Sequence, residues 1–247
     1  LALVAQAYNH KLNSSGGGLR QFYENSDTLF LQSVGGHEST PAFIELLRDS
    51  CIADIASALF DSPVWFIEEQ LFYKEAVDGG GSVRRTPWHQ DSSYQPFGGS
   101  KNIVVWVSLE PLAADESLEV VKGSHVGPTY NGVVYDPDDD TTPYFSEDEF
   151  PRVPDIEADR SQWNIESWPY KVGDVVAFHP NTLHGGATSQ PGKPRRTLAF
   201  RMFGDDVVRI DYPGVVKRDG GNEENYMGKF EQLEVGVNLS EAMSLTI

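Results

Sequence analysis

Short apolar runs separated by turn residues limit the folds open to this chain more than any other feature of its sequence. Beyond Pro63 these runs are rich in branched and aromatic residues, which is typical of β-strands. They cover residues 64–73, 103–109, 118–121, 175–178 and 197–203. Gly, Pro, Asp and Ser turns separate them, and most have no helical segment between them. This pattern favours an antiparallel sandwich or barrel over a parallel α/β sheet.

Helical patterns are confined to the residues before Pro63. In residues 40–60, Thr40 can cap a helix and Pro41 suits its first position. Apolar residues then recur at three- and four-residue intervals, namely Phe43, Ile44, Leu47, Cys51, Ile55 and Leu59. We expect one helix there and another over residues 19–34, which Gly35-Gly36 would end. The expected fold class is mainly β with flanking helices, a helix-backed jelly roll.

Composition bounds the size of the fold and the partners of the chain. The 247 residues, 39% of them hydrophobic, suffice for a single domain over 1–247. Within it we expect a helical part at about 19–60, a β core at about 64–210 and an acidic insertion at about 127–170. Lysine and arginine number 19 against 37 acidic residues, so the formal net charge is −18. Because such a surface repels phosphate backbones and anionic lipids, we expect no nucleic-acid partner and no membrane.

The location of the protein is predicted from two further features. No stretch approaches the roughly 20 apolar residues of a membrane span. Cys51 is the single cysteine, so an internal disulfide is impossible and a reducing, cytoplasmic setting is expected. The sequence opens at Leu1 rather than at a methionine, so upstream residues, a removed targeting segment among them, are compatible with it. Nothing in the pattern indicates an oligomeric state.

The insertion at about 127–170 carries much of the negative charge. Between Asp136 and Arg160 there are ten acidic residues and two arginines. Long irregular insertions are usually functional or mobile. Two interpretations stay open: a solvated acidic surface loop, or a lid over a pocket.

His89, Asp91 and His184 are the candidate metal ligands. In an extended segment residues i and i+2 point to the same face, so His89 and Asp91 lie side by side. His184 follows the apolar run 173–178 and precedes Gly185-Gly186, at a strand end or turn where a side chain can aim into a barrel mouth. Two imidazoles and one carboxylate leave three positions open on an octahedral ion, an arrangement that suits non-haem Fe(II) and oxygen.

Arg195 is the candidate partner of an anion. It enters the apolar run 197–203 eleven residues beyond His184. A guanidinium inside a barrel needs an anionic partner, and a dicarboxylate offers two oxygens to its planar fork. Strand alternation lets only one of Arg195 and Arg196 face inward. An exposed arginine pair at a strand edge is the other interpretation.

Five motifs occur in a fixed order, namely Trp88-His89-Gln90-Asp91, residues 103–110, residues 118–125, residues 173–185 and Pro194-Arg195. In this order they resemble the phytanoyl-CoA dioxygenase family of Fe(II)/2-oxoglutarate-dependent oxygenases, over roughly residues 64–203. The resemblance implies a double-stranded β-helix, a cupin-like jelly roll, with Fe(II) held by His89, Asp91 and His184. It also implies O2 and 2-oxoglutarate as cosubstrates, decarboxylation to succinate, and hydroxylation of a small molecule.

The same resemblance assigns the cosubstrate contacts. Arg195 would pair with the far carboxylate of 2-oxoglutarate, Lys74 matches a lysine that reaches this carboxylate in relatives, and Trp106 matches an aromatic residue lining the pocket. A solvated strand end for Lys74 and plain core packing for Trp106 are the alternatives. Two departures, Lys122-Gly123 in place of Pro-Gly and Asp115-Glu116-Ser117 in place of an Asn-Gly pair, weaken any transfer of substrate identity.

Two other functions compete with the oxygenase. A three-histidine cupin site could combine His89 or His125 with His179 and His184, with zinc as a candidate ion. A non-catalytic jelly-roll module could instead stack sugars on its tryptophans, which are Trp65, Trp88, Trp106, Trp163 and Trp168.

Overall fold

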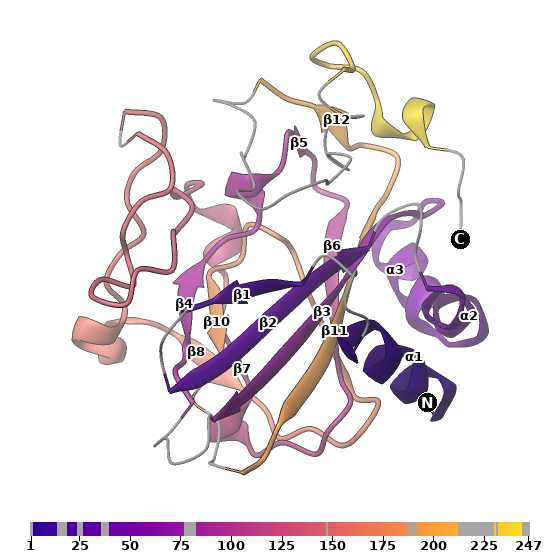
Figure 1. The fold of residues 1–247 in the computed structure, drawn as a ribbon. Coiled ribbons are helices and arrows are strands. Elements are labelled where there is room, and N and C mark those ends of the chain that lie inside the picture. The colour runs from indigo at the N-terminus through magenta and orange to yellow at the C-terminus, as the bar shows by residue number, and fades with distance from the viewer. Residues whose placement is uncertain are drawn as a thin grey trace.

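Antiparallel pairing builds the two main sheets, as the turn-separated apolar runs predict (Figure 1). The larger sheet has the order β1-β2-β3-β11-β6-β9 and the smaller one β4-β10-β7-β8, while β5 and β12 pair apart from both. The computed structural model describes residues 2–13, 19–23, 27–35, 40–76, 83–146, 148–186, 188, 192–211, 230 and 232–243. The five predicted strands beyond Pro63 are confirmed as β3, β6, β7, β9 and β11.

The strand bounds locate the two sheets in the sequence. The larger sheet contains β1 (Arg20–Phe22), β2 (Thr28–Gly35), β3 (Trp65–Ala76), β6 (Asn102–Ser108), β9 (Val175–Phe178) and β11 (Arg195–Phe203). The smaller sheet contains β4 (Thr86–His89), β7 (Leu118–Val121), β8 (Ile165–Ser167) and β10 (His184–Gly186). The separate pair is β5 (Phe97–Gly98) with β12 (Val208–Arg209). β11 therefore lies between β3 and β6, near the middle of the larger sheet.

Side-chain alternation gives the larger sheet two buried faces. On β11, Leu198 and Phe200 belong to a core that also contains helix residues, whereas Ala199 belongs to a second core with Trp106 and Leu118 of the other sheet. Successive residues of a strand point to opposite faces. Residues of β11 in register with Ala199, among them Arg195 and Arg201, therefore face the smaller sheet.

Three helices cover the outer face of the larger sheet (Figure 1). They are α1 (Ala2–Asn13), α2 (Pro41–Asp49) and α3 (Ile52–Phe60). Their buried side chains, including Phe43, Leu47 and Ala56, join the outer core, and burying a large apolar side chain stabilises a fold by about 1.5–3 kcal/mol. Among the described helices, none combines the length and the apolar character that crossing a membrane requires.

Of the two helix predictions, the one over 19–34 was wrong, and the one over 40–60 was confirmed except for a break. In the segment 19–34, expected to be helical, residues 20–22 form β1 and residues from 28 onward form β2, because β2 pairs along its length with β3, from Thr28 opposite Ala76 to Gly35 opposite Glu69. The single helix expected over 40–60 is divided into α2 and α3. The backbone turns extended at Ser50 (φ −109°, ψ 174°), where α2 ends.

Candidate active site

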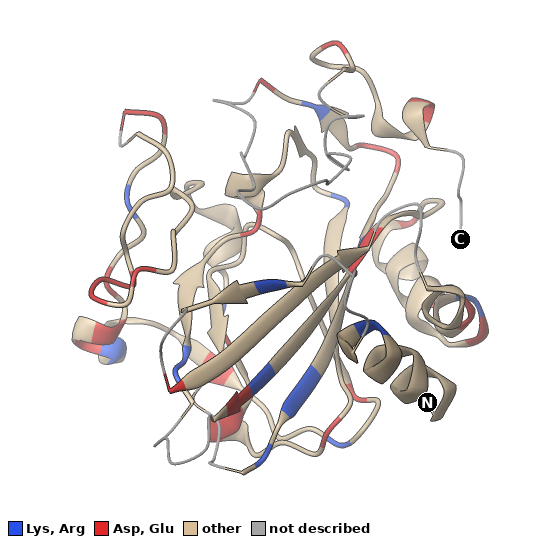
Figure 2. Ribbon diagram, viewed as in Figure 1, with Lys and Arg blue, Asp and Glu red and all other residues tan. Residues whose placement is uncertain are grey.

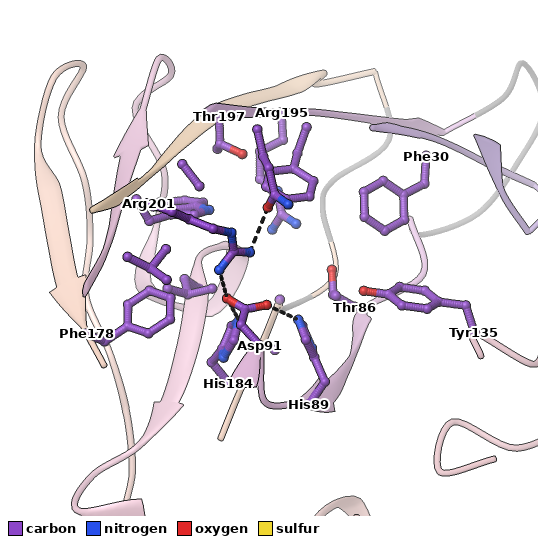
Figure 3. Close-up of a pocket in the computed structure, with 18 residues that line it drawn as sticks. Phe30, Thr86, His89, Asp91, Tyr135, Phe178, His184, Arg195, Thr197 and Arg201 are labelled. Carbon is purple, nitrogen blue, oxygen red and sulfur yellow. Dashed lines mark hydrogen bonds and ion pairs between the residues drawn. The ribbon is translucent and has the colours of Figure 1, made fainter. Parts of the chain in front are cut away.

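A pocket lies between the two sheets, with polar groups at its base and aromatic rings around it (Figure 3). It encloses about 570 Å³ when its open mouth is included. Strands β3, β6 and β11 form one wall, β4 and β10 another, and Tyr135 closes one side. All three predicted metal ligands line it, together with Arg195 and Trp106.

The three candidate ligands converge because two short strands pair beside a turn. His89 ends β4 and His184 begins β10, and these two residues are direct partners in the antiparallel register. Asp91 follows in a turn that is fixed by a hydrogen bond from its backbone N–H to the carbonyl of Pro180 (2.8 Å). One donor atom from each of the three residues lies within 4.8 Å of the others. Metal–ligand distances of about 2.0–2.2 Å place a divalent cation between such groups.

Both imidazoles are oriented for coordination through Nε2. The Nδ1–H of His89 donates to the carbonyl of Pro87 and that of His184 to the carbonyl of Thr182, each at 2.8 Å. Because a carbonyl can only accept, these bonds fix the tautomer and leave the Nε2 lone pairs available. The Nε2 atoms face the carboxylate of Asp91 at 3.8 and 3.7 Å, too far for hydrogen bonds. The donor set therefore fits a cation.

The protonation states also suit a cation. Burial, reinforced by His184, lowers the pKa of His89 to about 4, and burial lowers the pKa of His184. Burial opposes ionisation of Asp91, but Arg201, His184 and His89 outweigh it, so the pKa of Asp91 lies well below its usual value. At neutral pH the pocket thus presents two neutral imidazoles and one carboxylate.

Arg201 orients Asp91, and the sequence analysis missed it. Its Nη1 donates to Asp91 Oδ2 at 2.6 Å and its Nη2 donates to Gln70 Oε1 at 2.8 Å. Its Nε pairs with Glu68 Oε1 at 3.1 Å. The guanidinium thereby links β11 to β3 and holds the carboxylate toward the imidazoles. The available signal was its spacing: Arg201 lies six residues after Arg195 on one strand, so both face the pocket.

The structure distinguishes the two candidate arginines. Arg195 is 7% exposed, lines the pocket, and donates from Nη1 to the carbonyl of Glu116 at 2.9 Å. Burial lowers the pKa of Arg195 to about 10, so it stays charged at neutral pH. Arg196 points to the other face, where it contacts Glu110 and Asn9. Gly186 makes room for Arg195, since a Cβ there would lie 2.9 Å from its Nη2.

Lys74 and Trp106 have different positions relative to the pocket. Trp106 lines it and packs edge-on against Tyr170 with ring centroids 5.2 Å apart. Lys74 is not among the lining residues: its ammonium lies behind them, donating to Thr86 Oγ1 at 2.5 Å and sitting 4.3 Å above the ring of Phe30. Burial, then Arg195 and other nearby arginines, lowers the pKa of Lys74 well below its usual value.

The acidic insertion contributes to the site through Tyr135. This residue lines the pocket, and its hydroxyl points inward (Figure 3). Burial raises the pKa of Tyr135 well above its usual value, so the phenol stays protonated. Acidic residues are frequent on the loops of this insertion (Figure 2), but Val133, Val153 and Ile156 of the same segment are buried in a cluster with Trp88. The segment is therefore packed onto the sheet as well as solvated.

The competing sites are not brought together. Within the described ranges, the group of residues able to hold a metal comprises His89, Asp91 and His184, and it includes neither His125 nor His179. His179 instead contacts the carbonyl of Gly99 and accepts from the N–H of Asn181. The tryptophans do not form one surface: Trp65 stacks on Phe203, Trp106 belongs to one buried cluster, and Trp88 belongs to another, against which Trp163 packs.

Known proteins resemble this chain in sequence. The model of the family described as phytanoyl-CoA dioxygenase (PhyH) matches residues 21–197. The peroxisomal phytanoyl-CoA dioxygenase of Homo sapiens is 25% identical over 211 residues, 80% of this chain and 57% of that protein. This chain spans about half the length of the first curated relatives it matches.

Solved structures share the fold. The non-heme alpha ketoglutarate dependent carbocyclase SnoK from nogalamycin biosynthesis superposes with a TM-score of 0.68 at 18% identity, covering 96% of this chain and 83% of that one. The epimerase SnoN in complex with Fe3+, alpha ketoglutarate and nogalamycin RO gives 0.64 at 17% identity, covering 90% and 82%. At these identities the likeness establishes the jelly-roll architecture.

Proposed function

Because this chain belongs to the phytanoyl-CoA dioxygenase family, we propose that it is an Fe(II)- and 2-oxoglutarate-dependent dioxygenase that hydroxylates a small molecule. The observation that carries the proposal is the convergence of two Nε2 atoms and one carboxylate in a pocket that also holds the Arg195 guanidinium. Iron bound there would couple oxidative decarboxylation of 2-oxoglutarate, to succinate and CO2, with oxygen transfer from O2. All other roles fall to the side chains.

Each side chain has a role that follows from its position. His89, Asp91 and His184 would hold the iron, and Arg201 would keep Asp91 ionised and oriented. Arg195 would bind the far carboxylate of 2-oxoglutarate through its planar fork, with Trp106 forming the adjacent wall. Lys74 would act from behind Thr86, holding the Thr86 hydroxyl by a hydrogen bond rather than contacting the cosubstrate directly. The aromatic rings of the pocket would exclude water from the reacting atoms.

The substrate is proposed to be a small molecule that carries no phosphates. A net charge of −18 disfavours a CoA thioester, because its phosphates would meet a strongly acidic surface. A cytoplasmic setting is part of the same proposal, supported by the exposed free thiol of Cys51.

The proposal is tested first by spectroscopy without oxygen. Adding Fe(II) and 2-oxoglutarate to the anaerobic protein should give the weak visible charge-transfer band of the chelate. Asp91→Ala should lose this band and the oxygen-dependent formation of succinate. The matched control is His125→Ala, which removes an imidazole outside the candidate metal group and should retain both.

Two outcomes contradict the proposal. If the wild-type protein gives neither the band nor succinate, the pocket does not bind the chelate. If Asp91→Ala keeps wild-type succinate formation while remaining folded by circular dichroism, the assignment of the ligands is wrong.

A further inference from the structure

Tyr135 is the pocket residue whose placement the proposed function leaves unexplained. It belongs to the acidic insertion, yet it lines the pocket with His89 and His184, and its hydroxyl points inward (Figure 3). Within the part of the chain that the structure describes, no side chain or backbone group hydrogen-bonds to that hydroxyl. The phenol is therefore exposed to whatever the pocket contains.

The backbone of Tyr135 is strained and firmly held. Its φ of 61° is left-handed, which costs a residue other than glycine about 1–2 kcal/mol. Arg84 anchors the loop after it, donating to the carbonyl of Pro137 at 2.8 Å and to Asp140 Oδ1 at 2.8 Å. Before it, the N–H of Val133 donates to the hydroxyl oxygen of Tyr94 at 2.6 Å. A strained backbone that hydrogen bonds hold on both sides indicates that the position of the Tyr135 side chain is functionally important.

Aromatic neighbours fix the ring beside the candidate metal ligands. The ring centroid of Tyr135 lies 4.5 Å from that of Phe22, 6.1 Å from that of Phe30 and 6.3 Å from that of His89. Packing on the first two rings holds one side of the phenol and leaves the side toward His89 open to the pocket. Tyr135 is the phenol among the described residues that line it.

We propose that Tyr135 is a self-oxidation site: when 2-oxoglutarate is consumed with no substrate in the pocket, the Tyr135 ring receives the oxygen atom and becomes 3-hydroxytyrosine. This inference rests on the proposed function. One oxygen atom of O2 is inserted into the C–H bond beside the phenol hydroxyl, so the hydrogen ends on the new hydroxyl. The other enters the new carboxylate of succinate as CO2 leaves. The ring and 2-oxoglutarate each give up two electrons, and O2 gains the four.

Chemistry and position favour Tyr135 over the other rings of the pocket. The phenol oxygen makes the neighbouring ring carbons electron-rich, and Phe178, although its ring is 4.7 Å from that of His184, lacks this activation. Trp106 is also electron-rich, but it lies opposite Ala199 of β11, on the wall with Arg195. There 2-oxoglutarate bound to Arg195 would cover it, whereas the ring of Tyr135 lies beside the candidate ligand His89, with ring centroids 6.3 Å apart.

The experiment uses the whole chain with Fe(II), 2-oxoglutarate and isotopically heavy O2, without any added substrate. Trypsin should release residues 123–152 as one peptide, which contains Tyr135 together with Tyr130 and Tyr144 as internal controls. Fragment masses should place one heavy oxygen atom on Tyr135, about tenfold or more above the other two tyrosines, because reactivity falls steeply with misplacement. Omitting 2-oxoglutarate should abolish the label.

Two variants complete the test. Tyr135→Phe keeps the ring but removes its activation, and the label at this position should be lost. The ring centroid of Tyr23 lies 5.8 Å from that of Tyr135, but Tyr23 does not line the pocket. Tyr23→Phe should therefore leave both the label and succinate formation unchanged.

The outcomes separate this inference from the function on which it rests. Succinate without label on Tyr135, or with label mainly on Trp106 or Phe178, overturns the inference and leaves the dioxygenase proposal standing. Neither succinate nor the anaerobic chelate band overturns both. Label on Tyr135 that persists without 2-oxoglutarate is adventitious oxidation and also overturns the inference.

Discussion

Removing the Arg201 guanidinium should lower the free energy of unfolding, because it leaves the buried charges around Asp91 incompletely paired. The side chains of Arg201, Glu68 and Asp91 are 7%, 1% and 10% exposed. Arg201→Met keeps most of the volume but removes the guanidinium that both buried carboxylates contact. Because breaking a buried ion pair from one side costs about 3–5 kcal/mol, we expect the free energy of unfolding of the metal-free protein at pH 7 to fall by about that amount.

The pH dependence of this loss has a definite sign. In the wild-type protein the low pKa of Asp91 means that its ionised form stabilises the fold above the unfolded pKa, and this stability is lost as pH falls. Without Arg201, burial opposes ionisation of Asp91 and the strongest interaction that favours ionisation is lost. Protonation of Asp91 at low pH then relieves an unfavourable buried charge in the variant, whereas in the wild-type protein it breaks an ion pair. The difference in stability between wild type and variant should therefore narrow from pH 7 toward about 4.

Urea denaturation of the metal-free proteins across this range measures the effect. Arg196→Met is the matched control: it lies on the same strand, but its side chain is 30% exposed and its partner Glu110 22%, so its loss should cost less than about 1 kcal/mol. Adding Glu68→Gln to Arg201→Met should restore part of the stability. A loss below about 1 kcal/mol for Arg201→Met, or a difference that widens on acidification, would refute the reasoning.

Two other predictions concern binding and protonation. Arg195→Gln should weaken 2-oxoglutarate binding by about 2–4 kcal/mol, which raises the half-saturating concentration measured by the chelate band. Arg196→Gln should leave this concentration unchanged. The reverse result would contradict the assignment of Arg195 as the residue that binds 2-oxoglutarate. The pKa of His89 is lowered to about 4 in the folded protein, so as pH falls this histidine is protonated in the unfolded chain before it is protonated in the folded one. The metal-free protein should therefore lose about 3 kcal/mol of stability between pH 6.5 and 4. His89→Gln should flatten this slope, and an unchanged slope would contradict the assignment.

The strands and the site motif were predictable because local rules decide them. Alternation along a strand correctly implies that only one of Arg195 and Arg196 faces the pocket, and β11 places it opposite Lys74 of β3. The same rule, extended six residues, would have identified Arg201. Which face of β11 turns inward is settled by packing, since Leu198 and Phe200 are buried against the helices. The sequence of β11 alone does not determine which of its faces turns inward.

The errors arise where distant residues decide the structure. The apolar spacing in 19–34 suits a helix or a strand, and the long antiparallel register of β2 with β3 settles it. Glu68 and Gln70 enter the site through their contacts with Arg201, which no local pattern encodes. Tyr135 reaches the pocket because Arg84, some fifty residues earlier, holds its loop by the bond to Pro137. Such residues are visible only when the chain is folded.

The charge of the pocket cannot be inferred from the charge of the chain. Acidic residues of the surface pair with basic ones, such as Asp139 with Arg152 and Asp140 with Arg84. Arg195, in contrast, is buried and lines the pocket, and Figure 2 shows basic residues on strands of the larger sheet. A dianionic cosubstrate responds mainly to the nearest buried cation, because screening is weak where water is excluded. Raising the salt from about 0.01 M to about 1 M, which shortens the Debye length from about 30 Å to about 3 Å, should therefore change 2-oxoglutarate affinity little. A steep fall of affinity with salt would mean that exposed charges, and not Arg195, dominate binding.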